Sequence, residues 1–360
     1  MAVIDSVEHP GYLTIKTNVM KNLSKVKEIS SDLSSSIMSL TNVSFEIGDG
    51  SDYQVTPIDF SYNNDNSVKL YIVGTQAHIV SNKIMEFPEN CNYYFDNMIS
   101  LERVDGLKEY TTTRNTIHFG YFFNNDSNLL YADVSKFDMR KAESVQFMFA
   151  VCRKLQVIDV SNWEFGKDHS VLTRFMFRAA NAVRELDLSN WELKASNMSQ
   201  MFLGLNYVKV LDLSGFDTTD LYNLDNTFSS CPQLTTIYVG NKWKLSETKV
   251  GNAALTFNLS PNIVGGNGTH SDGAELSTDH RLDNIHLARP DLPGQPGYLT
   301  LKVAEIANLN SYTTANSIDM SEIKSIKFEY NTSYVYDYYE LSSNPDQSIK
   351  MYIINDECII

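Results

Sequence analysis

Short stretches in the middle of the chain alternate apolar and polar residues, as a β-strand with one buried face does. In LQVIDVSNW (155–163) apolar residues flank Asp159, which is therefore expected to point outward. About ten residues after such a stretch comes an apolar group with helix-like spacing. After the stretch at 129–137 this group consists of Val145, Met148, Phe149 and Cys152. The pattern predicts a short strand with a helical turn packed against it.

The strand pattern occurs five times at nearly constant spacing. The copies are LLYADVSKF (129–137), LQVIDVSNW (155–163), VRELDLSNW (183–191), VKVLDLSGF (208–216) and LTTIYVGNKW (234–243). Their central Asp, or Tyr238 in the last copy, are 26, 28, 25 and 26 residues apart. A Phe column at positions 149, 177, 202 and 228 moves by the same steps of 28, 25 and 26. A unit this short cannot bury its own apolar face, so we expect the copies to stack around one continuous core.

The repeat resembles a known family. VKVLDLSGFDTTDLYNLDNTFSSC (208–231) is similar to the BspA-like leucine-rich repeat of bacterial surface proteins. KIMEFPENCNYYFDNM (83–98) resembles the start of that family's repeat region, and NIVGGNGTHSD (262–272) with QPGYLTLK resembles its end. The resemblance covers about residues 83–302 and implies attachment to host cells, matrix or other bacteria.

The two ends of the chain also match each other. The matched pairs are PGYLTIK (10–16) with PGYLTLK (296–302), VSFE (43–46) with IKFE (326–329), and SVKLYIV (67–73) with SIKMYII (348–354). Asp5 and Asp291 stand five residues before the first motif of each copy. Both ends are rich in β-branched and aromatic residues, which favour strands. We infer two homologous β-rich domains that either mount the repeat region or cap its ends.

These patterns together predict an α+β fold. A leucine-rich-repeat-like solenoid, with a short strand plus a helical turn per unit of about 26 residues, is flanked by the two homologous small β-rich domains. The expected domains are 1–76 and 290–360 for the β-rich copies and 77–289 for the solenoid with its opening and closing segments. A short helix is expected within 21–33.

Composition narrows the function classes. The chain has 360 residues, 42% of them hydrophobic, which is enough for substantial cores. Its formal net charge of -15 repels nucleic-acid phosphate and anionic lipid, so neither is an expected partner. No apolar run approaches the roughly 20 residues of a spanning helix. MAVIDSVEHPGYLTIK has no basic and apolar regions of a secretory signal.

The cysteines and histidines do not indicate a metal or redox site. Cys152 and Cys231 stand three residues after the Phe column, at a small core position, and at about 4.8 Å per strand they lie roughly 14 Å apart, too far for a disulfide. Three histidines interleave with three aspartates near the end of the repeats: His270, His280, His286, Asp272, Asp279 and Asp283. These types suit a divalent cation, but their spacing is irregular. We expect no metal, no cofactor and no catalytic constellation, and hence no enzyme.

Stacking of the repeats aligns side chains in columns. One column comprises Asp133, Asp159, Asp187 and Asp212, and another Phe137, Trp163, Trp191 and Phe216. Carboxylates about 5 Å apart must accept hydrogen bonds or bind cations. The favoured interpretation is that each Asp and the Ser two residues later bond the backbone of their own turn, and that the rings belong to the core.

The outward positions two residues before the Asp column vary between copies, as a binding face of stacked repeats does. Together with the four aspartates, the candidates for this face are Arg103, Tyr131, Val157, Glu185, Val210 and Thr236. We therefore expect a non-catalytic recognition or adhesion protein.

The expected location is a virion surface, because a protein that assembles in the cytoplasm and leaves by lysis needs no export signal. The prediction is a bacteriophage tail, baseplate or capsid-attached protein that contacts a bacterial surface protein or glycan, binds other virion proteins, or forms homo-oligomers. The alternatives are a purely structural virion component, a bacterial surface adhesin, and a depolymerase with a carboxylate pair that sequence cannot locate.

Overall fold

The chain forms two compact units, Met1–Leu301 and Lys302–Ile360. The computed structural model describes residues 17–28, 31–273 and 280–302, and part of residues 309–360. The PGYLTIK motif at 10–16, Asp5 and Asp279 lie outside the described residues. The domain boundaries at 76/77 and 289/290 were inferred from the matching sequences of the two ends, and they stay a prediction.

A six-stranded sheet opens the first unit, in the order β3-β4-β5-β2-β7-β9. Its strands are β2 (Asn42–Ile47), β3 (Ile58–Asp59), β4 (Val68–Val73), β5 (Gln76–Ser81), β7 (Arg103–Asp105) and β9 (Tyr131–Ala132). Strand β2 runs parallel to both β5 and β7, whereas β4 runs antiparallel to β3 and β5. The N-terminal strands therefore continue directly into the first coils of the repeat region.

Two short helices cover this end, α1 (Leu23–Lys27) and α2 (Ser31–Met38). Asn22 caps α1 by accepting a hydrogen bond from the Ser24 backbone N–H. Leu23, Val26 and Ile37 turn into the core. The helix expected within 21–33 is thus present as α1 and the start of α2.

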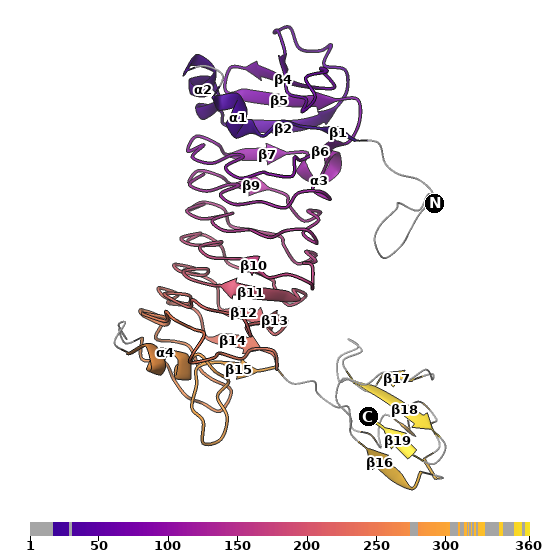
Figure 1. Ribbon diagram of the computed structural model, residues 1–360, viewed down its shortest axis with the longest axis vertical. Helices are drawn as coiled ribbons and strands as arrows, with labels where there is room; N and C mark the ends of the chain where they lie inside the picture. Colours follow the sequence, from indigo (N-terminus) through magenta and orange to yellow (C-terminus); the bar gives the residue numbers. More distant parts are fainter. Residues whose placement is uncertain are drawn as a thin grey trace. The chain divides into compact units, whose positions relative to one another are not determined.

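Below the sheet the chain winds in successive coils (Figure 1). Short parallel strands on two sides of the coils pair with the next copy. The strands are β1 (Asn18–Val19), β6 (Met85–Glu86), β8 (Thr111–Thr112), β10 (Val171–Leu172), β11 (Leu193–Asn197), β12 (Val210–Leu213), β13 (Phe216–Asp217), β14 (Thr236–Val239) and β15 (Thr300–Leu301). Parallel bridges between Asn90, His118 and Ser144 continue the ladder where no strand is formed. Two helices flank the coils, α3 (Leu107–Tyr110) and α4 (Arg281–Leu287).

The predicted α+β class and its leucine-rich-repeat-like solenoid are wrong. The described chain is mainly β, and no helix occurs between residues 113 and 273. At the apolar group expected to be helical, Phe147 and Val151 have left-handed backbones with φ of 58° and 63°. Such residues, four apart, interrupt any α-helix.

Hydrogen bonding in this segment explains why it does not form a helix. The backbone N–H groups of Phe147, Phe149 and Val151 donate to carbonyls of the next coil, at Arg174, Met176 and Arg178. The intervening residues bond three residues back, as Met148 does to Val145. The backbone is thus satisfied between coils, whereas a helix would satisfy it locally.

Aromatic rings fill the core of the coils in stacked columns. The rings of Phe137, Trp163, Trp191 and Phe216 have consecutive centroid separations of 6.3, 5.8 and 6.2 Å and interplanar angles of 7° or less. All four are buried, and Trp163 donates its Nε1–H to the Val134 carbonyl at 2.9 Å. The prediction that this column belongs to the core is confirmed.

Asp291 closes the far end of the coils. Its buried carboxylate accepts hydrogen bonds from the Asn267, Thr269 and Gly297 backbone N–H groups and from the Thr269 hydroxyl. The following strand β15 pairs with β14. The Asp that precedes PGYLTLK therefore ties the closing loop to the last strand.

The second unit contains a four-stranded sheet of order β16-β19-β18-β17. Its strands are β16 (Ser325–Lys327), β17 (Tyr339–Glu340), β18 (Lys350–Ile354) and β19 (Glu357–Ile359). Met351 and Cys358 are the buried centre of a small apolar cluster in this unit. Across the described residues of both units, every helix is too short or too polar to cross a membrane.

Candidate functional site

Neighbouring positions of the column predicted as a binding face pair in three places. Arg103 pairs with Tyr131, Val157 with Glu185, and Val210 with Thr236, each in parallel register. Val157 is 72% exposed, and the Arg103 guanidinium lies 4.7 Å from the centroid of the Tyr131 ring. The column is accessible, but it lines neither of the two pockets described below. Its role in binding stays a prediction.

The Asp column is satisfied within its own turns. The Asp133 carboxylate accepts from the backbone N–H of Ser135 at 3.0 Å and from its hydroxyl at 2.6 Å. The same arrangement joins Asp159 to Ser161 and Asp187 to Ser189, and Asp212 accepts from the Ser214 N–H. Burial opposes ionisation of Asp133, but Ser135 and Lys108 lower its pKa. These bonds confirm the turn-capping interpretation.

The histidine cluster is not brought together. His280 bonds Asp283 at 2.9 Å, whereas His286 bonds Glu247 at 2.8 Å. In the described part of the chain no three metal-ligating side chains converge. All four cysteines are unpaired and buried, as predicted for Cys152 and Cys231, and burial raises the pKa of the Cys231 thiol to about 12.

Two adjoining pockets lie on another side of the coils, and we call them together the flank groove. One has a volume of about 530 Å³ and is lined by Asn90, Asn92, His118, Glu143, Ser144, Gln146, His169, Ser170, Leu172 and Ser196. The other, of about 1,090 Å³, reaches α1 and shares Asn90 and Asn92 with the first. The two pockets therefore adjoin at Asn90 and Asn92.

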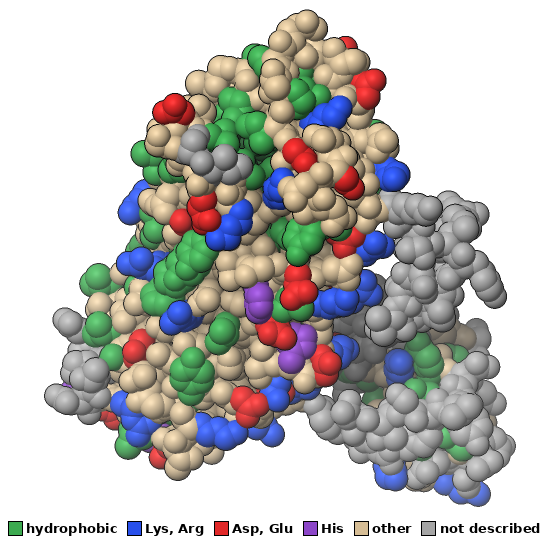
Figure 2. All heavy atoms as spheres, turned by 45° about the horizontal axis from the view of Figure 1, so that its top comes forward, with side chains coloured by type: hydrophobic (Ala, Val, Ile, Leu, Met, Phe, Trp, Pro, Cys, Tyr) green, Lys and Arg blue, Asp and Glu red, His purple; other side chains and the backbone are tan. Residues whose placement is uncertain are grey.

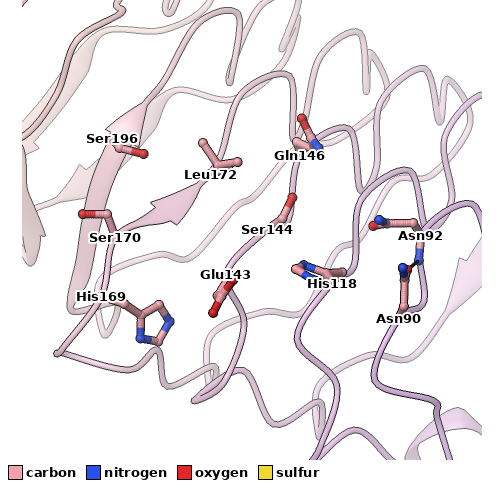
Figure 3. A pocket seen from close by; sticks show the side chains of 10 residues that line it. All are labelled: Asn90, Asn92, His118, Glu143, Ser144, Gln146, His169, Ser170, Leu172 and Ser196. Carbon is pink, nitrogen blue, oxygen red and sulfur yellow. Dashed lines mark hydrogen bonds between the residues drawn. The ribbon is translucent and has the colours of Figure 1, made fainter.

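Parallel pairing places the lining side chains in line. Asn90, His118, Ser144 and Leu172 are consecutive bridge partners, so they repeat at about the 4.8 Å spacing of neighbouring strands. Figure 3 shows these side chains following one another along successive coils, with Glu143 and His169 at the rim. A ligand lying along the groove would therefore pass Asn90, His118 and Ser144 at regular spacing before it reached the apolar Leu172.

Several of these groups have hydrogen-bonding capacity to spare. The Ser144 hydroxyl is buried and bonds nothing in the described part of the chain, although its residue lines the groove. Gln146 accepts from the Arg174 Nε at 2.7 Å, and Asn92 accepts from the Gly120 N–H at 2.8 Å. These bonds fix the two amide oxygens and leave the amide N–H₂ groups as donors.

His169 lies at the rim between two hydrogen-bond acceptors. Its Nδ1 faces the Asp168 carboxylate at 2.8 Å and its Nε2 faces the Ala142 carbonyl at 3.0 Å. Because both neighbours are acceptors, both ring nitrogens donate only in the imidazolium form. Burial opposes this charge, but the bonds to Asp168 and Ala142 raise the pKa of His169.

An aromatic ladder borders the groove. Tyr93, Tyr121, Phe147 and Phe175 stack with centroid separations of 4.5, 4.3 and 4.3 Å, and each has a left-handed backbone. Stacked rings cover one another's faces and present edges to solvent. Tyr93 is the first ring of the ladder, and one of its faces lies on Tyr121. The residue is 47% exposed and lines the pocket beside α1.

The α1 end of the groove is held by polar contacts. The Asn22 amide donates to the Asn90 and Asn92 carbonyls at 3.0 Å each, which fastens α1 to the first coil. The buried Glu86 carboxylate accepts from Arg114 and Asn115. Burial opposes ionisation of Glu86, but these bonds lower its pKa. Acidic and basic side chains are interspersed over the face seen in Figure 2.

The sequence contained a signal for this site that the repeat pattern did not use. The ladder residues stand two positions before the Phe column, as Phe147 does before Phe149 and Phe175 before Phe177. The groove residues Asn92 and Gln146 stand one position earlier still. Sequence alone could not assign them to a surface, because a helical turn would have placed them elsewhere.

Comparison with known proteins gives a family match within the coils. Residues 89–210 and 173–260 match a family model described as "Mycoplasma protein of unknown function, DUF285". The matched residues cover less than half of the chain and coincide with the coils. No curated protein and no solved structure matches.

Proposed function

We propose that this protein is a non-catalytic recognition protein that binds an extended cell-surface polysaccharide in the flank groove. The observation that carries the proposal is that the two pockets adjoin at Asn90 and Asn92, over coils whose side chains repeat at strand spacing. A regular polymer fits a regular series of polar groups.

The chemistry of the groove favours a sugar over a peptide. A pyranose has hydroxyl groups around its edge and C–H groups on its faces. The amides of Asn92 and Gln146 suit the edge, and the outer face of Tyr93 suits a C–H face. A peptide-binding groove would need apolar pockets at regular spacing. Among the described residues, Leu172 is the only apolar one that lines the pocket along the coils, whereas Val19, Phe87 and Pro88 line the pocket beside α1.

The resemblance of the repeats to BspA-like surface proteins supports an adhesive role. Residues 89–260 match a family of unknown function, so this match gives no information about a ligand. A place on a bacteriophage particle or on a bacterial cell stays a prediction from the sequence, and so does binding of other virion proteins. A purely structural component is the alternative, and it would bind no glycan.

Binding of the purified full chain to an array of bacterial capsular, O-antigen and teichoic-acid polysaccharides tests the proposal. Tyr93→Ala, which removes the free ring face, is expected to weaken binding to a retained glycan about tenfold or more, equivalent to roughly 1.4 kcal/mol. Gln146→Ala is expected to weaken it similarly. Titration calorimetry with the retained glycan gives the affinities.

Val157→Asp is the matched control, because it alters the exposed predicted face without touching the groove. Unchanged affinity of the two groove variants together with a loss in Val157→Asp would move the site to that face. Absence of any bound glycan would favour the structural alternative. Shortening of the polysaccharide during incubation would show catalysis and overturn the non-catalytic part of the proposal.

A further inference from the structure

The sheet of the second unit repeats the N-terminal part of the first sheet strand for strand. The order β17-β18-β19-β16 corresponds to β3-β4-β5-β2. In both sheets each of the outer three strands is antiparallel to the next, and the fourth is parallel to its neighbour.

The pairing register also agrees residue by residue. Ile353 pairs with Cys358 where Ile72 pairs with Ala77, and Tyr339 pairs with Met351 where Ile58 pairs with Leu70. Ile326 pairs with Cys358 as Val43 pairs with Ala77. The sequence matches at the two ends thus correspond to equivalent positions in the two sheets.

The two sheets differ at one edge. In the first, β2 carries β7 on the side away from β5, with Val43 opposite Val104. In the second, β16 is the last strand of the described sheet. Val43 is 1% exposed, whereas its counterpart Ile326 is 48% exposed. The buried centres agree, since Leu70 and Met351 are 1% and 0% exposed.

The backbone at this edge is oriented for pairing. The Lys327 carbonyl accepts from the Ile360 N–H, on the side of β19. Alternate residues of a strand direct their N–H and C=O groups to opposite edges, so those of Ile326 point away from β19. An exposed strand edge is a template for pairing with another chain.

We propose that the unit Lys302–Ile360 is a docking module, and that the outer edge of β16 binds the first coil of a partner molecule that carries a coil stack like that of residues 85–301. The proposal goes beyond the proposed function, because it concerns assembly and not the flank groove. The strand must come from a partner, because β7 of this chain is already paired on both sides, with β2 and β9.

Charge favours the same register. In the first sheet Ser44 lies opposite Asp105. Lys327 occupies the position of Ser44, so a docked strand of the Arg103-Val104-Asp105 type would place its Asp opposite a lysine. Opposite charges on directly paired residues stabilise a sheet.

The first test is an exchange variant of the full chain in which Val303–Ile360 replaces residues 17–79. Its coils should unfold in one cooperative transition. Ile326→Asp in the transplanted copy should lower the Tm of the coils by about 5 °C or more, because a buried carboxylate would face the first coil. The same substitution in the C-terminal copy is the matched control and should leave that Tm unchanged. An exchange variant that does not fold, or a Tm insensitive to the transplanted Asp, overturns the equivalence of the edges.

The second test detects docking between molecules. One full chain carries a photo-crosslinking phenylalanine analogue in place of Ile326. The other is Val43→Asp, which weakens the hold of β2 on β7. Crosslinks from position 326 should map to residues 98–110 of the second chain and should disappear when Lys327 of the first chain is also changed to Asp. Absence of these crosslinks, with the exchange variant folded, overturns docking between molecules.

Discussion

At the scale of single residues, the carboxyl group of Asp126 stands out because it is completely buried. One oxygen accepts from the Met98 N–H at 2.8 Å, and the other has no partner in the described part of the chain. Burial raises the pKa of Asp126 well above its usual range, although the Met98 bond and nearby Lys27 oppose this. The fold therefore disfavours ionisation of this carboxyl group.

A pH-dependent stability difference follows for Asp126→Asn. A group whose pKa is raised on folding stabilises the fold fully below its unfolded value of about 3.9, and this contribution is lost as pH rises through the folded pKa. The natural chain should therefore lose stability relative to Asp126→Asn as pH increases from about 4 to 8. Urea unfolding of both chains across this range measures the difference. Parallel stability curves would contradict the assignment.

Individual backbone conformations matter as much as side chains here. Val151 and Gly204 occupy equivalent places in different coils, and both are left-handed, with φ of 63° and 80°. A β-branched residue is strained there, whereas glycine is not. The left-handed backbone at this site is thus strained in the coil of Val151 but not in the coil of Gly204.

Val151→Gly should raise the free energy of unfolding by about 1 kcal/mol, because relief of backbone strain exceeds the added entropy of the unfolded chain. Gly204→Val is the reciprocal change and should lower it by about 2 kcal/mol. Urea denaturation of the two variants checks both signs. Changes of the same sign would show that local packing, and not the left-handed backbone, determines stability at this site.

At the scale of elements, the period of the repeat was predictable but the shape of its second half was not. The step of 25 to 28 residues and the inward Phe column are visible in the sequence, and Phe149 and Phe177 stack as expected at 5.8 Å. The segment around Phe147 has apolar spacing that a helix and a series of turns share. Only the bonds to the next coil decide between them, and such long-range bonds leave no local sequence pattern.

The candidate site, too, was predictable from the sequence only in part. The polar columns of the flank groove depend on the turn geometry, so their residues could not be assigned to one surface beforehand. Positions of the face predicted from the strands do pair in register, as Val210 with Thr236 shows. Its strands were readable because alternation reports directly which side chains point outward.

At the scale of the whole molecule, an array of coils needs closed ends. The first sheet covers one end of the coils, and the loop held by Asp291 closes the other. Burial opposes ionisation of Asp291, but its hydrogen bonds lower its pKa. The stabilising carboxylate is thus present above its unfolded pKa, and its contribution is lost as pH falls through the folded value.

Asp291→Ala should destabilise the Met1–Leu301 unit by on the order of 3 kcal/mol, because several backbone donors lose a buried acceptor. The loss should shrink in acid, where the natural carboxyl is protonated as well. Asp283→Ala, at an exposed residue bonded to His280, is the control and should change stability little. Thermal unfolding at pH 7 and pH 3 provides the comparison. Equal effects of the two substitutions would show that the loop does not depend on Asp291.

The stacked indoles have a spectroscopic consequence. The chain has three tryptophans, Trp163, Trp191 and Trp243, and all three are buried in the coil-bearing unit with their Nε1–H groups bonded to carbonyls. Trp163 and Trp191 lie 5.8 Å apart and nearly parallel, close enough to exchange excitation energy. Indole emission therefore reports on the coil-bearing unit alone. Unfolding of the Lys302–Ile360 unit should leave this emission unchanged.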